Sequence, residues 1–241
     1  MLQAHTDRGL VRETDEDAAF AEQLPGGVAV LVVADGVGGY PGGEIASATA
    51  VAAVAAVLRT SGLDDPGQAL AVAFAEANRR VRAAQQGAYA QMSTTLVAAL
   101  VREGSAWVAN VGDSRGYLVS EGEARPLTLD HSWAAEAIRA GRLAEGDPAA
   151  ILNRHLITRS VGSERELAVD VYGPIALPPG SVLLLCTDGL HNIVDDLQIA
   201  EIVGASSGDY AADLLAEALG RGAPDNVAVA LFAQPPSDGR A

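Results

Sequence analysis

Residues 28–44, with the sequence VAVLVVADGVGGYPGGE, decide how the rest of the chain is interpreted. The run from Val28 to Ala34 is continuously apolar and rich in β-branched residues, which predicts a buried strand. Asp35 follows directly, and the glycines after it allow the backbone to approach another group closely. The pattern predicts that a buried strand delivers one carboxylate to the edge of the protein.

The composition describes an acidic protein with a sizeable core. The 241 residues include 31 Asp and Glu against 16 Lys and Arg, which gives a formal net charge of −15. A chain of this length buries roughly 70–75% of its unfolded surface. No block of basic residues offers the surface that nucleic-acid binding needs, so we exclude nucleic acid as a partner. The surplus carboxylates either solubilise the surface or, where a few converge, hold divalent cations.

The cysteine content and the N-terminal segment predict a cytoplasmic protein. Cys186 is the single cysteine, which leaves no pair for a disulfide within the chain and no thiolate set for zinc. The segment that begins at Met1 lacks the charged-then-apolar pattern of a signal peptide. No apolar run approaches the ~18–20 residues of a membrane span. We expect a monomer in the cytoplasm without a membrane span.

The order of predicted elements indicates one domain over residues 1–233, followed by a frayed tail over 234–241. After the first strand we expect two amphipathic helices. One spans about 44–59, and the other starts at Pro66 with Asp65 as its cap.

Short strands and turns make up much of the rest. Glu103-Gly104 and Glu121-Gly122 are typical of hairpin turns, so we interpret the runs around them as an antiparallel meander. The turn-rich segment at about 134–153 is a candidate flap. Strands are expected at 94–101, 106–111, 116–119, 181–186 and 227–232, and helices at about 131–142 and 210–219.

Four aspartates occupy the ends of these apolar strands. Asp35, Asp113 and Asp188 each follow a strand, and Asp225 precedes the last one. Carboxylates at neighbouring strand ends repel one another unless a cation lies between them. Ligation by oxygen suits Mg²⁺ or Mn²⁺ rather than zinc, and the four histidines lack the paired spacing of a helical zinc site. The sequence therefore predicts a divalent metal centre.

A second interpretation is a serine hydrolase. Residues 112–116, GDSRG, match the G-x-S-x-G nucleophile elbow, with Ser114 as the nucleophile and Asp188 and His191 in the required order. An elbow is followed by a helix, whereas residues 116–119 are typical of a strand. The close spacing of Asp188 and His191 also suits a triad poorly, so the metal centre is favoured.

The aspartates and their flanking residues together resemble the PP2C-like metal-dependent protein Ser/Thr phosphatases, the PPM family, in their compact bacterial form. The resemblance runs nearly from end to end and keeps the family's order. Its motifs are Arg12 with EDA at 16–18, ADGVGG at 34–39 with GGE at 42–44, MSTT at 92–95, NVGDSR at 110–115, LT at 127–128 with DHS at 130–132, ITR at 157–159 with Gly162, CTDGL at 186–190 and DNV at 225–227.

This resemblance implies an α+β fold, a four-layer αββα sandwich in which two antiparallel β-sheets lie between helices. It also implies a metal site at one edge, between the sheets. The implied ligands are Asp35 as a bridge between two ions, the Gly36 carbonyl on one ion, Asp188 and Asp225 on the other, and Asp113 with Asp188 on a third. Glu16 and Asp17 would orient metal-bound waters from behind.

The implied reaction is direct hydrolysis of a phosphate monoester. Two divalent ions convert a bridging water into hydroxide near neutral pH, and the forked guanidinium of Arg12 holds the phosphate. Bacterial members of the family usually carry His where this chain has Tyr40. A phenol, with an ordinary pKa of about 10, is a poorer proton donor at neutral pH than an imidazolium. We therefore predict that p-nitrophenyl phosphate, whose leaving group needs little protonation, is hydrolysed well relative to phosphopeptides.

Together these inferences predict a protein-serine/threonine phosphatase that uses Mn²⁺ or Mg²⁺, as two or three ions. Its expected partners are phosphorylated proteins, either the substrates of a Ser/Thr kinase or the kinase itself. Tyr40 keeps one alternative open, a catalytically weak signalling module that retains the fold and the metals and serves as a binding partner.

Overall fold

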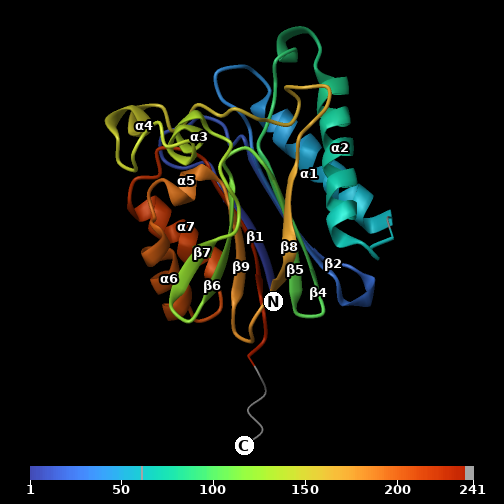
Figure 1. Ribbon diagram of the computed structural model, residues 1–241, viewed down its shortest axis with the longest axis vertical. Coiled ribbons are helices and arrows are strands. Elements are labelled where there is room, and N and C mark those ends of the chain that lie inside the picture. Colours follow the sequence, from blue (N-terminus) through green and yellow to red (C-terminus); the bar gives the residue numbers. More distant parts are fainter. Residues whose placement is uncertain (61, 237–241) are drawn as a thin grey trace, which may run out of the picture.

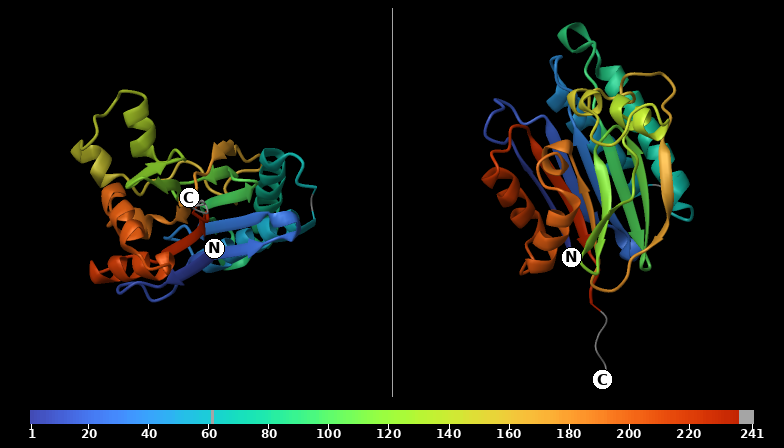
Figure 2. Two further views of the ribbon diagram at one scale, coloured as in Figure 1. Left: turned by 90° about the horizontal axis from the view of Figure 1, so that it is seen from below. Right: turned by 60° about the vertical axis from the view of Figure 1, so that its left-hand side comes forward.

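Two five-stranded antiparallel β-sheets pack face to face between two layers of helices (Figures 1 and 2). The computed structural model describes residues 1–60 and 62–236, so residues 237–241 of the expected tail lie outside the described residues. One sheet has the strand order β1-β10-β9-β6-β7 and the other the order β2-β3-β4-β5-β8. These four layers confirm the predicted αββα sandwich.

The strands of the first sheet are β1 (Leu2–Asp7), β10 (Val227–Ala233), β9 (Val182–Cys186), β6 (Arg115–Ser120) and β7 (Glu123–Pro126). Those of the second sheet are β2 (Asp17–Gln23), β3 (Ala29–Asp35), β4 (Leu96–Arg102), β5 (Ser105–Val111) and β8 (Asp170–Ala176). The second sheet is covered by α1 (Gly43–Thr60) and α2 (Pro66–Ala84), and the first by α6 (Asp196–Ala205) and α7 (Tyr210–Gly220) (Figure 1). Shorter helical turns are η1 (Pro25–Gly27), η2 (Gly87–Tyr89), α3 (Trp133–Arg139), α4 (Pro148–Leu152) and α5 (Asp188–His191).

The strand β3 shows why the central strands are apolar at every position. Val30 and Val32 pack among the residues of α1 and α2, whereas Leu31 and Val33 pack against the other sheet. Because successive side chains of a strand point to opposite faces, a strand that is covered on both faces needs apolar residues throughout. The same division holds in β9, where Leu184 faces the helices.

The two helices that follow β3 confirm the prediction. Asp65 caps α2 by accepting a hydrogen bond from the Gln68 amide at 3.0 Å. In α1, an 18-residue window has a mean hydropathy of 1.3, so its length and composition would suit a membrane span. The expectation that no apolar run has this length was therefore wrong. Half of that window is buried inside the protein, because α1 packs on the second sheet and on α2.

Both predicted hairpin turns are present, but the predicted meander is wrong between β5 and β6, which belong to different sheets. Glu103 and Glu121 each have φ of 53° and are followed by a glycine with positive φ, as a two-residue hairpin turn requires. The chain then leaves the second sheet after β5 and enters the first sheet at β6. Gly112, with φ of 105°, lies in this crossover. The crossover carries Asp113 to the boundary between the sheets.

Several elements were not predicted, namely β1, β2, β8, α4, α5 and α6. The candidate flap contains α3 and α4, which lie beside the end of the first sheet (Figure 1). The tail that was expected to start at residue 234 begins with Gln234 still hydrogen-bonded, because its amide donates to the Ser181 carbonyl at 2.8 Å.

Candidate active site

A cavity of about 350 Å³ lies where strand ends of the two sheets meet. Five acidic side chains line it: Glu16, Asp35, Asp113, Asp188 and Asp225. The lining also includes Arg12, Gly36 and His155. The structure therefore gathers most of the residues that the sequence nominated, although they are spread over the whole chain.

Asp35 and Gly36 are held by hydrogen bonds with the residues directly before β4 and β2. Its amide donates to Thr95 Oγ1 at 3.0 Å, and its carbonyl accepts from the Thr95 amide at 2.8 Å. The Gly36 amide then donates to the Glu16 carbonyl at 3.1 Å. A Cβ on Gly36 would lie 2.5 Å from the carbonyl carbon of Gly43, so only glycine allows the loop to pass so close to α1.

Asp188 and Asp17 are linked through Thr187. Asp188 starts the short helix α5 directly after β9, and its Oδ2 accepts from Asn192 Nδ2 at 2.9 Å. Thr187 Oγ1 donates to Asp17 Oδ2 at 2.8 Å and accepts from the Ala228 amide at 2.9 Å. Asp17 pairs with Asp35 across β2 and β3 but does not line the cavity. Asp17 therefore lies next to lining residues without being one, whereas Glu16, which was also predicted to act from behind, is part of the lining.

The loop that carries Arg12 is anchored by Asn226. The Asn226 side chain accepts from the Glu16 amide at 2.9 Å and donates to the carbonyls of Arg8 and Thr14, each at 2.9 Å. Arg12 Nη2 in turn donates to Asp225 Oδ2 at 2.8 Å. The anchored loop therefore places a cation at the rim of the acidic cavity.

Asp113 lies in the crossover between β5 and β6 and is buried, with 8% of its surface exposed. Two histidines fix the backbone there. His131 Nδ1 accepts from the Gly112 amide at 3.1 Å, and His191 Nε2 donates to the Asp113 carbonyl at 3.0 Å. Burial lowers the pKa of His191 to about 4, so this imidazole is neutral at pH 7.

The clustered carboxylates are in an environment that disfavours their charged forms. Burial, followed by repulsion from Asp17, Asp188 and Asp113, raises the pKa of Asp35 well above its ordinary value. Burial and then Asp188 raise the pKa of Asp113 to about 8. Burial and then Asp225 raise the pKa of Asp188. Without a nearby positive charge, this set of carboxylates destabilises the fold.

These donors fit a hard divalent cation. Carboxylate and backbone carbonyl oxygens are the ligands that Mg²⁺ and Mn²⁺ prefer, and a cation among them would remove the repulsion. Over residues 1–60 and 62–236, no three His, Cys, Asp or Glu side chains already converge as a closed ligand set. The carboxylates line the cavity from separate elements and would have to turn toward an ion.

The sequence pattern of the family described as "Protein phosphatase 2C" matches residues 3–221. The chain belongs to the protein phosphatase 2C family. The serine/threonine phosphatase stp of Listeria welshimeri is 32% identical over 94% of this chain and 92% of its own length. The solved structure of the S. agalactiae serine/threonine phosphatase superposes with a TM-score of 0.88 at 31% identity, covering 97% of this chain and 99% of that one. The catalytic domain of PstP, solved in complex with two manganese ions, has a TM-score of 0.81 at 32% identity, with 96% of each chain covered.

As a member of the protein phosphatase 2C family, this chain is a metal-dependent protein serine/threonine phosphatase that acts on phosphoproteins. The catalytically weak module is not favoured. Neither is the serine hydrolase: Ser114 is fully buried, its Oγ lies 2.7 Å from Thr95 Oγ1, and strand β6 rather than a helix follows it.

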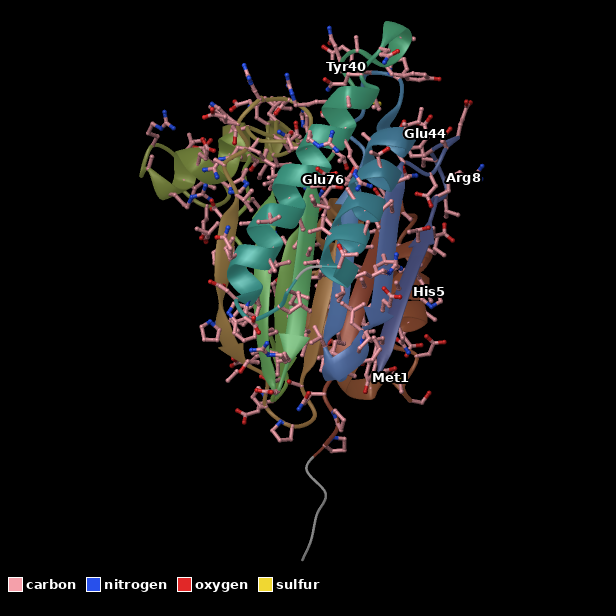
Figure 3. All side chains as sticks on the ribbon, turned by 90° about the vertical axis from the view of Figure 1, so that its right-hand side faces the viewer. Met1, His5, Arg8, Tyr40, Glu44 and Glu76 are labelled. Atoms are coloured by element: carbon pink, nitrogen blue, oxygen red, sulfur yellow. The ribbon has the colours of Figure 1, made fainter. Side chains whose placement is uncertain are left out.

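Tyr40, which was predicted as a catalytic residue of this phosphatase 2C chain, does not line the cavity. Its side chain is 54% exposed and is not part of the lining. Figure 3 shows it near the tip of the loop after β3. Conversely, sequence reasoning gave no role to Thr187, Asn226 or His155. Asn226 follows Asp225 directly and so offered a signal, whereas nothing in the residues around His155 predicted that it reaches the cavity.

Proposed function

We propose that this phosphatase hydrolyses phosphoserine and phosphothreonine in proteins by direct attack of water on phosphorus, without a covalent enzyme intermediate. The observation that carries this proposal is the gathering of five carboxylates and Arg12 in one cavity. A phosphate monoester is an anion and would be repelled by such a cavity unless cations lay between them. The arrangement therefore suits a substrate that is recognised through bound divalent ions.

The oxygens that would hold these ions come from strand ends and from one glycine. We assign two ions to Asp35, the Gly36 carbonyl, Asp188 and Asp225, and a third ion to Asp113 with Asp188. When bound, such ions supply a hydroxide nucleophile near neutral pH and neutralise charge that develops on the phosphate. Mn²⁺ and Mg²⁺ are the ions that suit these donors.

Arg12 binds and orients the phosphate. Its side chain is half-exposed at the cavity, and the loop that carries it is fixed through Asn226. A guanidinium presents two parallel N–H donors to two oxygens of a phosphate, which restricts the orientation of the P–O bond that breaks.

Glu16 and Asp17 support the lining groups. Glu16 lines the cavity itself, whereas Asp17 is outside the lining and accepts a hydrogen bond from the Thr187 hydroxyl. We infer that Glu16 orients a water and that Asp17 fixes the backbone before Asp188. Supporting groups of this kind hold lining residues in one orientation.

The chemistry of the site also constrains the partners. We expect the substrates to be phosphorylated proteins, either targets of a Ser/Thr kinase or the kinase itself. Location in the cytoplasm, a monomeric state and the exclusion of nucleic acid stay predictions from the sequence.

A phosphopeptide assay tests the proposed function. Purified protein is given a phosphothreonine peptide with Mn²⁺, with Mg²⁺ and with EDTA, and released phosphate is measured. We expect turnover with metal and none with EDTA, and a loss of at least about 100-fold in Asp188→Asn, because removing a ligand removes the nucleophile. Glu201→Gln, on the exposed side of α6, is the matched carboxylate control. Absence of metal-dependent turnover in the wild type would overturn the proposal.

A serine-directed phosphonate tests the alternative interpretation, in which Ser114 is the nucleophile of a serine hydrolase. We expect it to leave activity unchanged, because Ser114 is buried and hydrogen-bonded to Thr95. Loss of activity together with covalent labelling of Ser114 would instead support a serine nucleophile.

A further inference from the structure

Hydrolysis of a phosphoserine or phosphothreonine expels an alkoxide, which leaves readily only when it receives a proton as the P–O bond breaks. Given the proposed function, the protein needs a proton donor at the cavity. Tyr40 does not meet this need in the structure, because its side chain is 54% exposed and is not part of the lining.

Three of the four histidines are excluded as the proton donor by their position or by their hydrogen bonds. His5 lies on β1, far down the sheet from the end of the molecule where Tyr40 lies (Figure 3). Both ring nitrogens of His131 are engaged, one by the Gly112 amide at 3.1 Å and the other with Asp170 Oδ2 at 3.1 Å. His191 is half-buried, and its Nε2 donates to the Asp113 carbonyl at 3.0 Å.

His155 is the histidine that lines the cavity with the five carboxylates and Arg12. It lies in the segment after α4, and the backbone on both sides of it is tied to the start of α3. The Trp133 amide donates to the Leu156 carbonyl at 2.8 Å, and the Thr158 amide donates to the His131 carbonyl at 2.8 Å. The His155 side chain itself is exposed, so solvent can return a proton to it after each turnover.

The other side chains of the cavity are poor candidates for this task. A guanidinium keeps its proton at neutral pH, so Arg12 can bind phosphate but cannot act as an acid. The four lining aspartates are needed in their charged form to hold cations, and Glu16 is assigned to orient a water. An imidazole ordinarily changes its charge between pH 5 and 8, and His155 is the imidazole in the lining.

We propose that His155 is the general acid of this phosphatase. An imidazolium N–H of His155 donates its proton to the Oγ of the leaving serine or threonine while that oxygen's bond to phosphorus breaks. The oxygen of the attacking water forms the new bond to phosphorus. The products are the free hydroxyl side chain and inorganic phosphate, and the neutral imidazole takes up a proton from solvent. One water is consumed, and no further reactant is required.

The dependence of the rate on the leaving group tests this assignment. The wild type, His155→Ala and His5→Ala are assayed with Mn²⁺ on a phosphothreonine peptide and on p-nitrophenyl phosphate. In His155→Ala we expect kcat on the peptide to fall by about 100-fold or more, while kcat on p-nitrophenyl phosphate stays within about threefold, because nitrophenolate leaves without a proton. His5→Ala, which removes an exposed histidine on β1, should change neither rate.

Three further measurements separate proton donation from a structural role. Free imidazole should restore part of the peptide activity of His155→Ala. The decline of kcat with rising pH on the peptide should disappear in that variant. His155→Gln, which keeps a polar side chain but cannot donate a proton in this pH range, should behave like His155→Ala.

Equal losses on both substrates in His155→Ala would overturn the assignment, since they indicate binding or positioning rather than proton transfer. A selective loss on the peptide in Tyr40→Phe, with His155→Ala unaffected, would assign the acid to Tyr40 and also overturn it. Failure of the wild type on both substrates would contradict the proposed phosphatase function itself.

Discussion

Arg12 Nη2 donates a hydrogen bond to Asp225 Oδ2 at 2.8 Å, which joins residues 213 positions apart in the chain. In the proposed function, one of these residues binds phosphate and the other binds a metal ion. In that proposal, a cation held by Asp225 would compete with Arg12 for the carboxylate and would leave the guanidinium free to bind the phosphate. The ion pair holds the Arg12 side chain at the cavity, where the proposed function needs it.

Replacing Arg12 by alanine should weaken phosphate binding without unfolding the protein. We expect kcat/KM on a phosphopeptide to fall by about 10- to 100-fold, because charge-assisted hydrogen bonds contribute roughly 1.5–3 kcal/mol. The stability should change by no more than about 1 kcal/mol, since the side chains of the pair are 46% and 36% exposed. Arg8→Ala, in the same loop and exposed, is the control. Steady-state kinetics that match the wild type would contradict the role of Arg12.

Asp35→Asn should stabilise the metal-free protein while abolishing its response to metal. Asp35 lies among Asp17, Asp113 and Asp188, so removing its charge relieves repulsion. With EDTA we expect Tm to rise by about 2–8 °C, which corresponds to roughly 1–2 kcal/mol for a domain of this size. Mn²⁺ should raise the Tm of the wild type but not of Asp35→Asn, as followed by differential scanning fluorimetry.

Glu201→Gln removes one negative charge from the exposed side of α6 and is the control for net charge. Its Tm should respond to EDTA and Mn²⁺ as the wild type does. A lower Tm for Asp35→Asn in EDTA would show that the carboxylate cluster is not repulsive.

His131 should make the protein less stable as the pH falls below neutrality. Burial lowers the pKa of His131, although the hydrogen bond to Asp170 opposes this effect. The Gly112 amide already donates to Nδ1, so that nitrogen cannot take up a proton without losing the bond. The unfolded chain, whose imidazole has an ordinary pKa of about 6.5, therefore binds the proton first.

We expect the free energy of unfolding of the wild type to decrease more steeply than that of His131→Asn between pH 7 and pH 5. One proton limits the difference in slope to about 1.4 kcal/mol per pH unit. Urea titrations at several pH values measure it. Although burial raises the pKa of Asp170, its hydrogen bonds with His131 and Arg159 lower it overall, so its contribution is lost only below about pH 4. Parallel slopes for the two proteins above pH 5 would refute the assignment to His131.

Gly189→Ala should damage both stability and activity. A Cβ at this position of α5 would overlap the carbonyl oxygen of Asn226, whose side chain anchors the loop with Arg12. We expect a loss of about 1–3 kcal/mol in the free energy of unfolding, as for other overpacked sites, together with a higher KM. Gly204→Ala is the control, because nothing lies within 4 Å of its Cβ and it is part of α6. It should be neutral or stabilising by up to about 1 kcal/mol.

Strand prediction succeeded where local sequence carries the physical signal. β3, β9 and β10 are covered on both faces, so each is a continuous apolar run that is visible without any partner. β1 and β2 were missed because their residues are mostly half-buried and mixed in polarity, which leaves no regular period. The choice of sheet for β6 could not be predicted either, because turn residues indicate a reversal but not the sheet to which the next strand belongs.

In the candidate site, too, the features that local sequence carries were predicted and those that depend on tertiary structure were not. Asp35, Asp113, Asp188 and Asp225 were predicted as a group because each ends or begins an apolar strand. The hydrogen bonds that support them were not predicted. Thr187 donates to Asp17, 170 positions away in the sequence, and Asn226 donates to the carbonyl of Arg8, 218 positions away. Such hydrogen bonds depend on strand order and register, which local composition does not encode.

The sequence by itself determined that apolar strands end in carboxylates, since burial of a strand on both faces and the chemistry of its terminal residue are local properties. Only the tertiary structure decided which groups share the cavity with them. It excluded Tyr40 from the lining and brought in His155, because the position of each side chain depends on how the loop after β3 and the segment after α4 pack on the ends of the two sheets.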